Sequence, residues 1–163
     1  FSVPIGIIVR DRDSGEVRVG RDGRPIVRYR LSDHDAGHLR SGMEGAAKIL
    51  DAAGAQLIWS GQTSFPQYRP KVAGTLQGFM SLVDEGGLGP GQVALGSFHI
   101  MGSARMGGSP ATSACTPAGE TWEVRNLFVA DGSTFPTACG VNPMISIESA
   151  AHMVSRGIAA RLA

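Results

Sequence analysis

The chain has 163 residues, 42% of them hydrophobic, which is enough for a folded domain with a substantial core. Fifteen basic and fourteen acidic residues give a net charge of +1 without any block of like charges, which argues against a nucleic-acid-binding protein. No apolar run approaches the roughly 18 residues that cross a bilayer, so we expect a soluble protein with no transmembrane segment and favour a cytoplasmic location.

The N-terminal residues predict an antiparallel meander of three short strands. These strands are expected at 5–10, 16–19 and 25–31, where apolar and charged residues alternate. The connecting sequences DSG at 13–15 and DG at 22–23 are typical of tight turns. We therefore expect a half-buried sheet.

A helix is predicted next. Ser32 and Asp33 can cap it, and Gly54 should end it. Its apolar residues recur at three- and four-residue spacing: Leu39, Met43, Ala46, Leu50 and Ala53. We expect this helix to cover one face of the sheet. A further strand is predicted at 56–60 and a further helix at 74–83.

The C-terminal part predicts a short apolar strand at 126–130, a loop at 131–141 and a helix at 143–162. Asn142 and Pro143 form a standard helix start, because Asn suits the cap position and Pro the first helical position. A wide stripe of apolar residues should be buried along the helix: Ile147, Ala150, Ala151, Val154, Ile158 and Leu162.

Cysteine and histidine residues give no metal signal. Cys115 and Cys139 form no CxxC pair, so we expect two free, mostly buried thiols rather than a disulfide or a zinc site. His34 and His38 lie one helical turn apart and could in principle ligate a metal. No third ligand has a convincing spacing, so we expect a solvated helix face and no metal. His152 is expected to pack inside the last helix.

Two stretches of the glycine-rich second half carry chemical information. The first is SFHIMGSARMG at 97–107, and the second is NLFVADGSTFPTACGVNPMISI at 126–147. Together, in this order and at this spacing, they resemble the C-terminal signature of the glucose/methanol/choline (GMC) family of flavin-dependent oxidoreductases. We assign Arg105, in the first stretch, no catalytic role.

The resemblance extends over nearly the whole chain. The meander, YRLS at 29–32 and AAGA at 52–55 look like the substrate domain of that family, and GVNPMI at 140–145 looks closest to long-chain alcohol oxidases. The resemblance implies an α+β fold in which helices cover the antiparallel sheet of a substrate domain at 1–96. A signature region at 97–163 would follow, and its strand and helix would return to an FAD-binding domain whose main part is absent.

The resemblance also implies a catalytic pair. His99 matches the catalytic histidine of the family, and Asn142 matches a second active-site position that would bond the substrate oxygen. Oxidising an alcohol requires removal of the hydroxyl proton while hydride leaves the carbon, and an imidazole accepts such a proton near neutral pH. Taken without the family, an isolated histidine such as His99 is more often a satisfied histidine of the core than a catalytic residue.

FAD is the implied cofactor. The backbone around Asn142, Pro143 and Met144 would lie against the flavin, where the unpaired N–H groups of a helix start meet negative charge. Asp131 and Gly132 match an Asp-Gly pair near the ribityl and phosphate part of FAD, although an ordinary turn is the alternative. No GxGxxG follows a strand. We therefore expect FAD to be held only together with an N-terminal FAD-binding half, from the same or a separate chain.

The leading hypothesis is an FAD-dependent oxidoreductase acting on the CH–OH group of a small-molecule alcohol, with a long-chain alcohol as one candidate. His99 would take the hydroxyl proton while hydride passes to flavin N5, and oxygen or another carrier would reoxidise the flavin. A non-redox hydroxynitrile lyase on the same scaffold and a non-catalytic interaction module are the alternatives. The presence of both His99 and Asn142 argues against the module.

Overall fold

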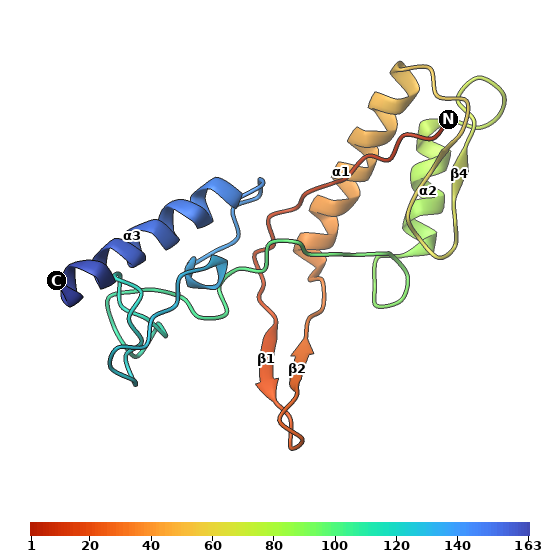
Figure 1. Ribbon diagram of the computed structural model, residues 1–163. Coiled ribbons are helices and arrows are strands. Elements are labelled where there is room, and N and C mark those ends of the chain that lie inside the picture. The colour runs from red at the N-terminus through yellow and green to blue at the C-terminus, as the bar shows by residue number, and fades with distance from the viewer. The chain divides into compact units, whose positions relative to one another are not determined.

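The computed structural model describes residues 1–163 and divides the chain into two compact units, which we call the first unit (Phe1–Gly96) and the second unit (Ser97–Ala163) (Figure 1). The two regions expected from the sequence have the same bounds, while the roles given to them stay predictions. None of the helices combines the length and the apolar character needed to cross a bilayer.

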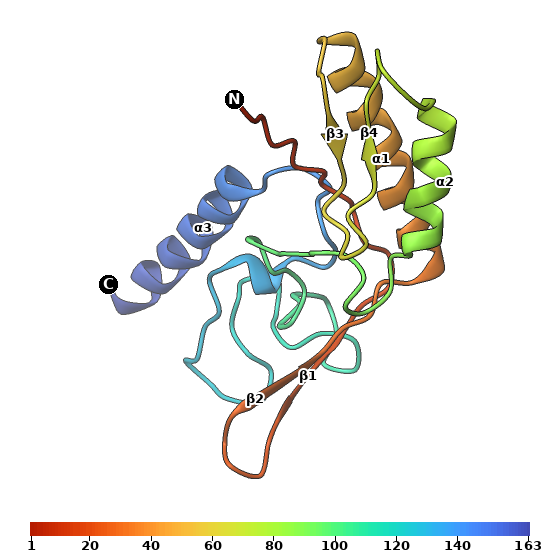
Figure 2. The same ribbon diagram turned by 90° about the vertical axis from the view of Figure 1, so that its right-hand side faces the viewer.

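The core of the first unit lies between two helices and a short hairpin. These elements are α1 (Asp33–Ala52), α2 (Leu76–Gly86), and the antiparallel strands β3 (Ile58–Trp59) and β4 (Gln67–Tyr68). Figure 2 shows the hairpin against α1 and α2. The buried core residues are Leu39, Met43, Ala47, Ile58, Tyr68, Phe79, Met80 and Val83. Full burial of one large apolar side chain contributes about 1.5–3 kcal/mol, so this cluster stabilises the unit.

Helix α1 begins and ends as predicted. The Ser32 hydroxyl accepts a hydrogen bond from the backbone N–H of Asp35, and the chain leaves the helix through Gly54 at a φ of 85°. A cap of this kind contributes about 0.5–2 kcal/mol. The guanidinium of Arg40 forms a two-pronged ion pair with Asp84 of α2 and ties the two helices together. The predicted helix at 74–83 is confirmed as α2, whereas the predicted strand at 56–60 shortens to β3.

The predicted three-stranded meander is wrong. Only β1 (Glu16–Val19) and β2 (Pro25–Arg28) pair, and residues 5–10 form no strand. No backbone hydrogen bond joins residues 1–9 to another segment. Ile7 and Val9 instead pack on the core. Figure 1 shows the N-terminal segment running along α1. The alternating pattern correctly indicated extended backbone, but a strand also needs a hydrogen-bonded neighbour, and the chain places none there.

The β1–β2 hairpin is exposed on both faces rather than half-buried. Its register sets Val17 opposite Val27 and Val19 opposite Pro25, so these four residues form one entirely apolar face. Val17, Val19 and Val27 are 58%, 81% and 69% exposed. Helix α1 packs on β3 and α2. The expectation that this helix covers the N-terminal sheet is therefore wrong.

The second unit consists of hydrogen-bonded loops, a 3₁₀ turn η1 (Gly132–Thr134) and the helix α3 (Met144–Leu162). The predicted strand at 126–130 is wrong, because only Phe128 forms an isolated bridge, with Glu120. Flanking backbone bonds join Thr121 to Leu127 and Val129 to Gly119, but they do not extend into a ladder. The pairing ends at turns on both sides, where the N–H of Gly119 donates to the carbonyl of Thr116 and that of Leu127 to the carbonyl of Val124.

The predicted C-terminal helix is confirmed as α3, but its apolar stripe is only partly buried. Val154 is buried, and the residues on the same face are half-buried: Ile147, Ala150, Ala151 and Ile158. Leu162, at the end of the stripe, is exposed. His152 is also exposed, so the expectation that it packs is wrong.

Candidate functional site

The proposed catalytic and flavin-facing residues all belong to the second unit, where two motif segments run side by side. The backbone N–H of Ala104 donates to the carbonyl of Ser133 at 3.0 Å, and that of Met106 donates to the carbonyl of Thr134 at 2.8 Å. These bonds hold the segment after His99 along the turn η1. The two signature stretches, distant in sequence, therefore form one local structure.

Gly132 is the residue at which this structure meets the start of α3. A Cβ atom at Gly132 would lie 3.2 Å from the carbonyl oxygen of Ile100 and 3.0 Å from Cδ1 of Ile147. Ile100 directly follows His99, and Ile147 lies in the first turns of α3. A glycine permits both close approaches, because any side chain there would displace one neighbour. The segments that carry His99 and Asn142 thus converge on Gly132, while a contact between the two side chains stays a prediction.

His99 and Asn142 are both exposed in the second unit. His99 is therefore not a buried core histidine of this unit, and its catalytic role stays a prediction. Apolar residues flank the pair in sequence, namely Phe98, Ile100 and Val141, and these are exposed as well. A polar residue with exposed apolar neighbours suits contact with a molecule that has one hydroxyl and an apolar body.

Asn142 does not cap α3, contrary to expectation. Pro143 occupies the cap position, and no side chain forms a hydrogen bond to the first turn. The first helical bond runs from the N–H of Ile147 to the carbonyl of Pro143 at 2.9 Å. The N–H groups of Met144, Ile145 and Ser146 consequently have no partner within the chain. The helix start offers free donors, and the Asn142 amide is free of a capping role.

Asp131 closes the turn that precedes the helix. Its Oδ1 accepts hydrogen bonds from the backbone N–H of Ser133 at 2.8 Å and from the Ser133 hydroxyl at 2.5 Å. The Thr134 hydroxyl donates to the Asp131 carbonyl at 2.8 Å. This is ordinary turn chemistry. Asp131 is exposed and Gly132 is buried, and a role of these two residues toward a cofactor stays a prediction.

Both cysteines are free, as predicted, and Cys115 is buried. Burial raises the pKa of the Cys115 thiol, and the negative charge of Asp131 raises it further. A raised pKa keeps the thiol protonated near neutral pH, and a protonated thiol is a poor nucleophile. Cys115 therefore serves as a packing residue of the second unit.

Glu120 and Arg161 form an anchor at the C-terminal end of α3 that the sequence did not predict. Glu120 accepts a hydrogen bond from the backbone N–H of Asn126 at 2.9 Å and one from the guanidinium of Arg161 at 2.7 Å. The guanidinium also lies over the Phe128 ring, 5.2 Å from its centroid. These contacts fix the direction of the helix whose start faces the site. No local pattern joins residues so far apart in sequence.

Replacing Glu120 by Gln should destabilise the second unit at neutral pH. The Asn126 N–H and the Arg161 guanidinium hold the pKa of Glu120 below its ordinary value. A depressed pKa in the folded state contributes stability that is present above the unfolded-state pKa and is lost as the pH falls through the folded-state pKa. Urea denaturation of both proteins at pH 7 and at increasingly acidic pH should show a difference that shrinks toward zero. A difference independent of pH would contradict this role.

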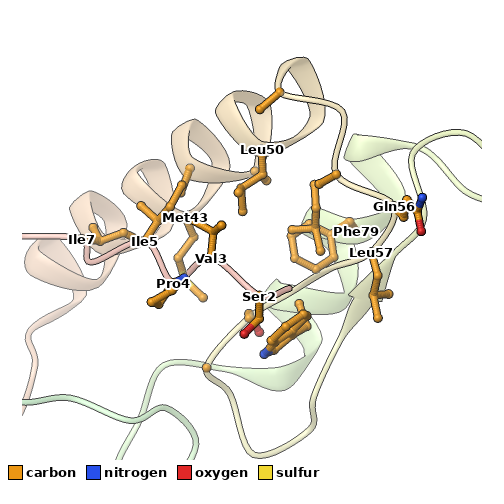
Figure 3. Close-up of a pocket in the computed structure, with 18 of the residues that line it drawn as sticks. Ser2, Val3, Pro4, Ile5, Ile7, Met43, Leu50, Gln56, Leu57 and Phe79 are labelled. Carbon is orange, nitrogen blue, oxygen red and sulfur yellow. The ribbon is translucent and has the colours of Figure 1, made fainter.

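The first unit contains an open, largely apolar pocket of about 860 Å³, which we call the cavity. Figure 3 shows the N-terminal segment from Ser2 to Ile7 along one side of it, with Met43 and Leu50 extending from α1 and Phe79 from α2. No residue with a titratable side chain lines the cavity. It therefore lacks the groups that proton transfer requires, and we assign it no part in the reaction.

Comparison with known proteins identifies the family. The profile of the GMC oxidoreductase family, for its C-terminal part, matches residues 11–151. The chain belongs to the GMC oxidoreductase family. The matched residues include the whole of the 97–107 stretch and of the 126–147 stretch, which together form the GMC signature expected from the sequence.

Curated relatives of this GMC chain include oxidases. Long-chain-alcohol oxidase FAO4A from Arabidopsis thaliana is 39% identical over 156 residues, which cover 93% of this chain and 20% of the relative. The 6'''-hydroxyparomomycin C oxidase from Streptomyces lividus is 29% identical over 167 residues, which cover 98% of this chain and 26% of the relative. This GMC chain thus spans about a fifth to a quarter of the length of these relatives.

The fold is also similar to that of a solved oxidase. The crystal structure of pyridoxine 4-oxidase from Mesorbium loti matches with a TM-score of 0.62, over 91% of this GMC chain and 28% of that chain, at 18% identity. The likeness supports the α+β class with small antiparallel sheets and three helices. The larger helix-covered sheet expected from the sequence is not formed by this chain, whose strands make two separate hairpins.

Proposed function

We propose that this chain is the C-terminal, substrate-side part of an FAD-dependent oxidoreductase that oxidises the CH–OH group of an alcohol. The observation that carries the proposal is the convergence on Gly132 of the His99 segment and the uncapped start of α3, in a chain that matches the GMC family. The name of the relative FAO4A favours a long-chain alcohol as substrate. The exposed apolar neighbours of His99 and Asn142 suit such a molecule.

In the proposed reaction His99 accepts the hydroxyl proton of the alcohol on its imidazole. The Asn142 amide donates a hydrogen bond to the same oxygen and orients the C–H bond that breaks. Bound FAD would supply the acceptor for the hydride that leaves the carbon. The alcohol loses one proton and one hydride and becomes a carbonyl compound, which balances the reaction.

The start of α3 supports the proposed contact with FAD. The free N–H groups at the start of α3 and the positive end of its dipole suit a ring that gains negative charge, and a favourable charge at such a helix end contributes about 0.3–2 kcal/mol. We assign this contact to the backbone around Pro143 and Met144. We assign the ribityl and phosphate part to Asp131, which is exposed, and to the neighbouring backbone at Gly132, whose missing side chain makes room for Ile100 and Ile147 within the chain.

We further propose that an N-terminal half, in the same or a separate chain, supplies the phosphate-binding part of the FAD site. The chain contains no GxGxxG motif and spans only about a fifth of the length of FAO4A. It also exposes apolar surface that a partner would cover, including the Val17–Val27 face and Met144, Ile145 and Met153, which are 58%, 67% and 64% exposed.

Anaerobic titration of the complete enzyme with primary alcohols of increasing chain length tests the proposed activity. We expect long-chain alcohols to bleach the oxidised flavin spectrum at lower concentrations than short ones, since an apolar chain adds about 0.8 kcal/mol of binding per buried CH₂ group. The matching carboxylic acids, which have no CH–OH hydride to give, serve as controls. Hydroxynitrile cleavage without bleaching would instead support the lyase.

A further inference from the structure

The start of α1 brings together three potential metal ligands. The ligand atoms of His34, Asp35 and His38 all lie within 4.8 Å of one another. Residues three or four positions apart share one side of a helix, so both Asp35 and His34 neighbour His38. Spacing in the sequence pairs the two histidines without a third ligand, and the structure supplies it in Asp35.

Hydrogen bonds from the surrounding residues fix the orientation of the Asp35 carboxylate. The residue is fully buried. Its Oδ1 accepts a hydrogen bond from the backbone N–H of Arg12 at 3.0 Å. Its Oδ2 accepts one from the backbone N–H of Asp13 at 3.3 Å and one from the hydroxyl of Ser32 at 2.8 Å. Each carboxylate oxygen has about two acceptor sites, so Oδ1 retains one. Hydrogen bonds of this kind orient carboxylates that bind metal ions.

The two histidines are exposed and lie ring to ring. Their ring centroids are 4.4 Å apart at an interplanar angle of 65°. Zinc bonds to nitrogen and oxygen of about 2.0–2.2 Å imply ligand atoms roughly 3.3 Å apart in a tetrahedral site. The ligand atoms here lie within 4.8 Å of one another, so binding would require the two exposed histidine side chains to rotate toward Asp35. Asp33 and Asp35 also supply negative charge in the first helical turn, which offsets the unfavourable effect of the helix dipole on a cation.

We propose that His34, Asp35 and His38 bind one divalent transition-metal cation, most suitably Zn²⁺, with water as the fourth ligand. Two imidazole nitrogens and one carboxylate oxygen favour Zn²⁺ over Mg²⁺ and Ca²⁺, which prefer oxygen ligands alone. The bound ion would fasten the start of α1 to the Arg12–Asp13 segment. The proposal is independent of the proposed alcohol oxidation, since all its residues lie in the first unit.

Calorimetric titration of the metal-free full chain with ZnCl₂ tests the site. We expect one Zn²⁺ per chain, and at least a tenfold weaker affinity for both His34→Ala and His38→Ala. Both histidines are exposed, so these variants should fold normally. His152→Ala, an equally exposed histidine of α3 outside the cluster, is the matched control and should bind zinc like the parent. Titration with MgCl₂ should show no comparable binding.

Asp35→Asn tests the third ligand, and circular dichroism establishes whether that variant folds. Because Asp35 also supports the helix start, Co²⁺ bound to the parent chain gives a second measurement, with the intense visible absorption of a tetrahedral site expected. The proposal is overturned if the parent binds no zinc, or if either histidine variant binds it as tightly as the parent. An unchanged affinity in folded Asp35→Asn, or the weak spectrum of octahedral Co²⁺, would overturn the three-ligand site.

Discussion

Replacing His99 by Ala in the complete enzyme should slow flavin reduction by alcohol about 10²- to 10⁴-fold, which corresponds to roughly 3–5 kcal/mol of activation free energy. The reason is that His99 is proposed to accept the hydroxyl proton. Bound FAD should be retained, because the proposed cofactor contacts of the second unit are backbone groups around Gly132 and Pro143. Anaerobic stopped-flow reduction, normalised to bound FAD, measures the effect.

Because His99 is exposed in the second unit, its replacement should separate a loss of catalysis from a loss of folding stability. Surface substitutions usually change the free energy of unfolding by less than about 0.5 kcal/mol, so His99→Ala should leave the packing of the second unit, in which His99 is exposed, intact. His152→Ala, which removes an exposed histidine of α3, is the matched control and should reduce the flavin at the parent rate. Reduction of the His99→Ala enzyme at the parent rate would rule out the catalytic assignment.

Asn142→Ala becomes an equally useful companion variant. The sequence suggested that loss of this residue would also remove a helix cap and confuse the two effects. Because no side chain caps α3, the variant should leave the helix intact and affect only the orientation of the substrate.

The chain 1–163 alone should lose FAD on dialysis and retain it only together with the N-terminal half. The proposed flavin-facing groups are a few backbone donors at one helix start, whereas a phosphate-binding GxGxxG loop is missing from the sequence. The flavin absorbance that remains after dialysis, with and without the co-expressed half, measures retention.

Circular dichroism of the isolated chain provides the control, because an unfolded chain would lose FAD for a different reason. Two helices of about twenty residues should give a clear helical signal if the chain folds alone. Stoichiometric, yellow FAD in the dialysed isolated chain would contradict the proposed division of the cofactor site.

Local sequence signals predicted the helices and the chemical motifs well. The Ser32 cap, the apolar spacing from Leu39 to Leu50 and the glycine at position 54 act within a few residues of one another, so α1 could be read directly from the chain. The GMC signature could also be recognised in the sequence, because its residues occur in a fixed order within two short stretches. These stretches by themselves indicate the family to which the chain belongs.

Strand pairing and burial depended on the tertiary structure. Residues 5–10 and 126–130 have the composition of strands, but a ladder forms only where a second segment supplies matching hydrogen bonds. The alternating valines of β1 and β2 likewise indicated a buried face that nothing in the chain covers. Periodicity indicates which side chains favour burial or an extended backbone, but the segment that would cover them or pair with them is not encoded nearby in the sequence.

In the candidate site, too, the sequence identified individual residues, whereas the tertiary structure determined which of them lie close together. His99, Asn142 and Asp131 could be named from motifs, yet their relation depends on Gly132, where Ile100 and Ile147 approach from segments far apart in sequence. The Glu120–Arg161 anchor and the position of Asp35 beside two histidines were likewise visible only in three dimensions. Residue identity sets the available chemistry, but packing between distant segments decides which groups meet, because it depends on contacts that no short stretch of sequence contains.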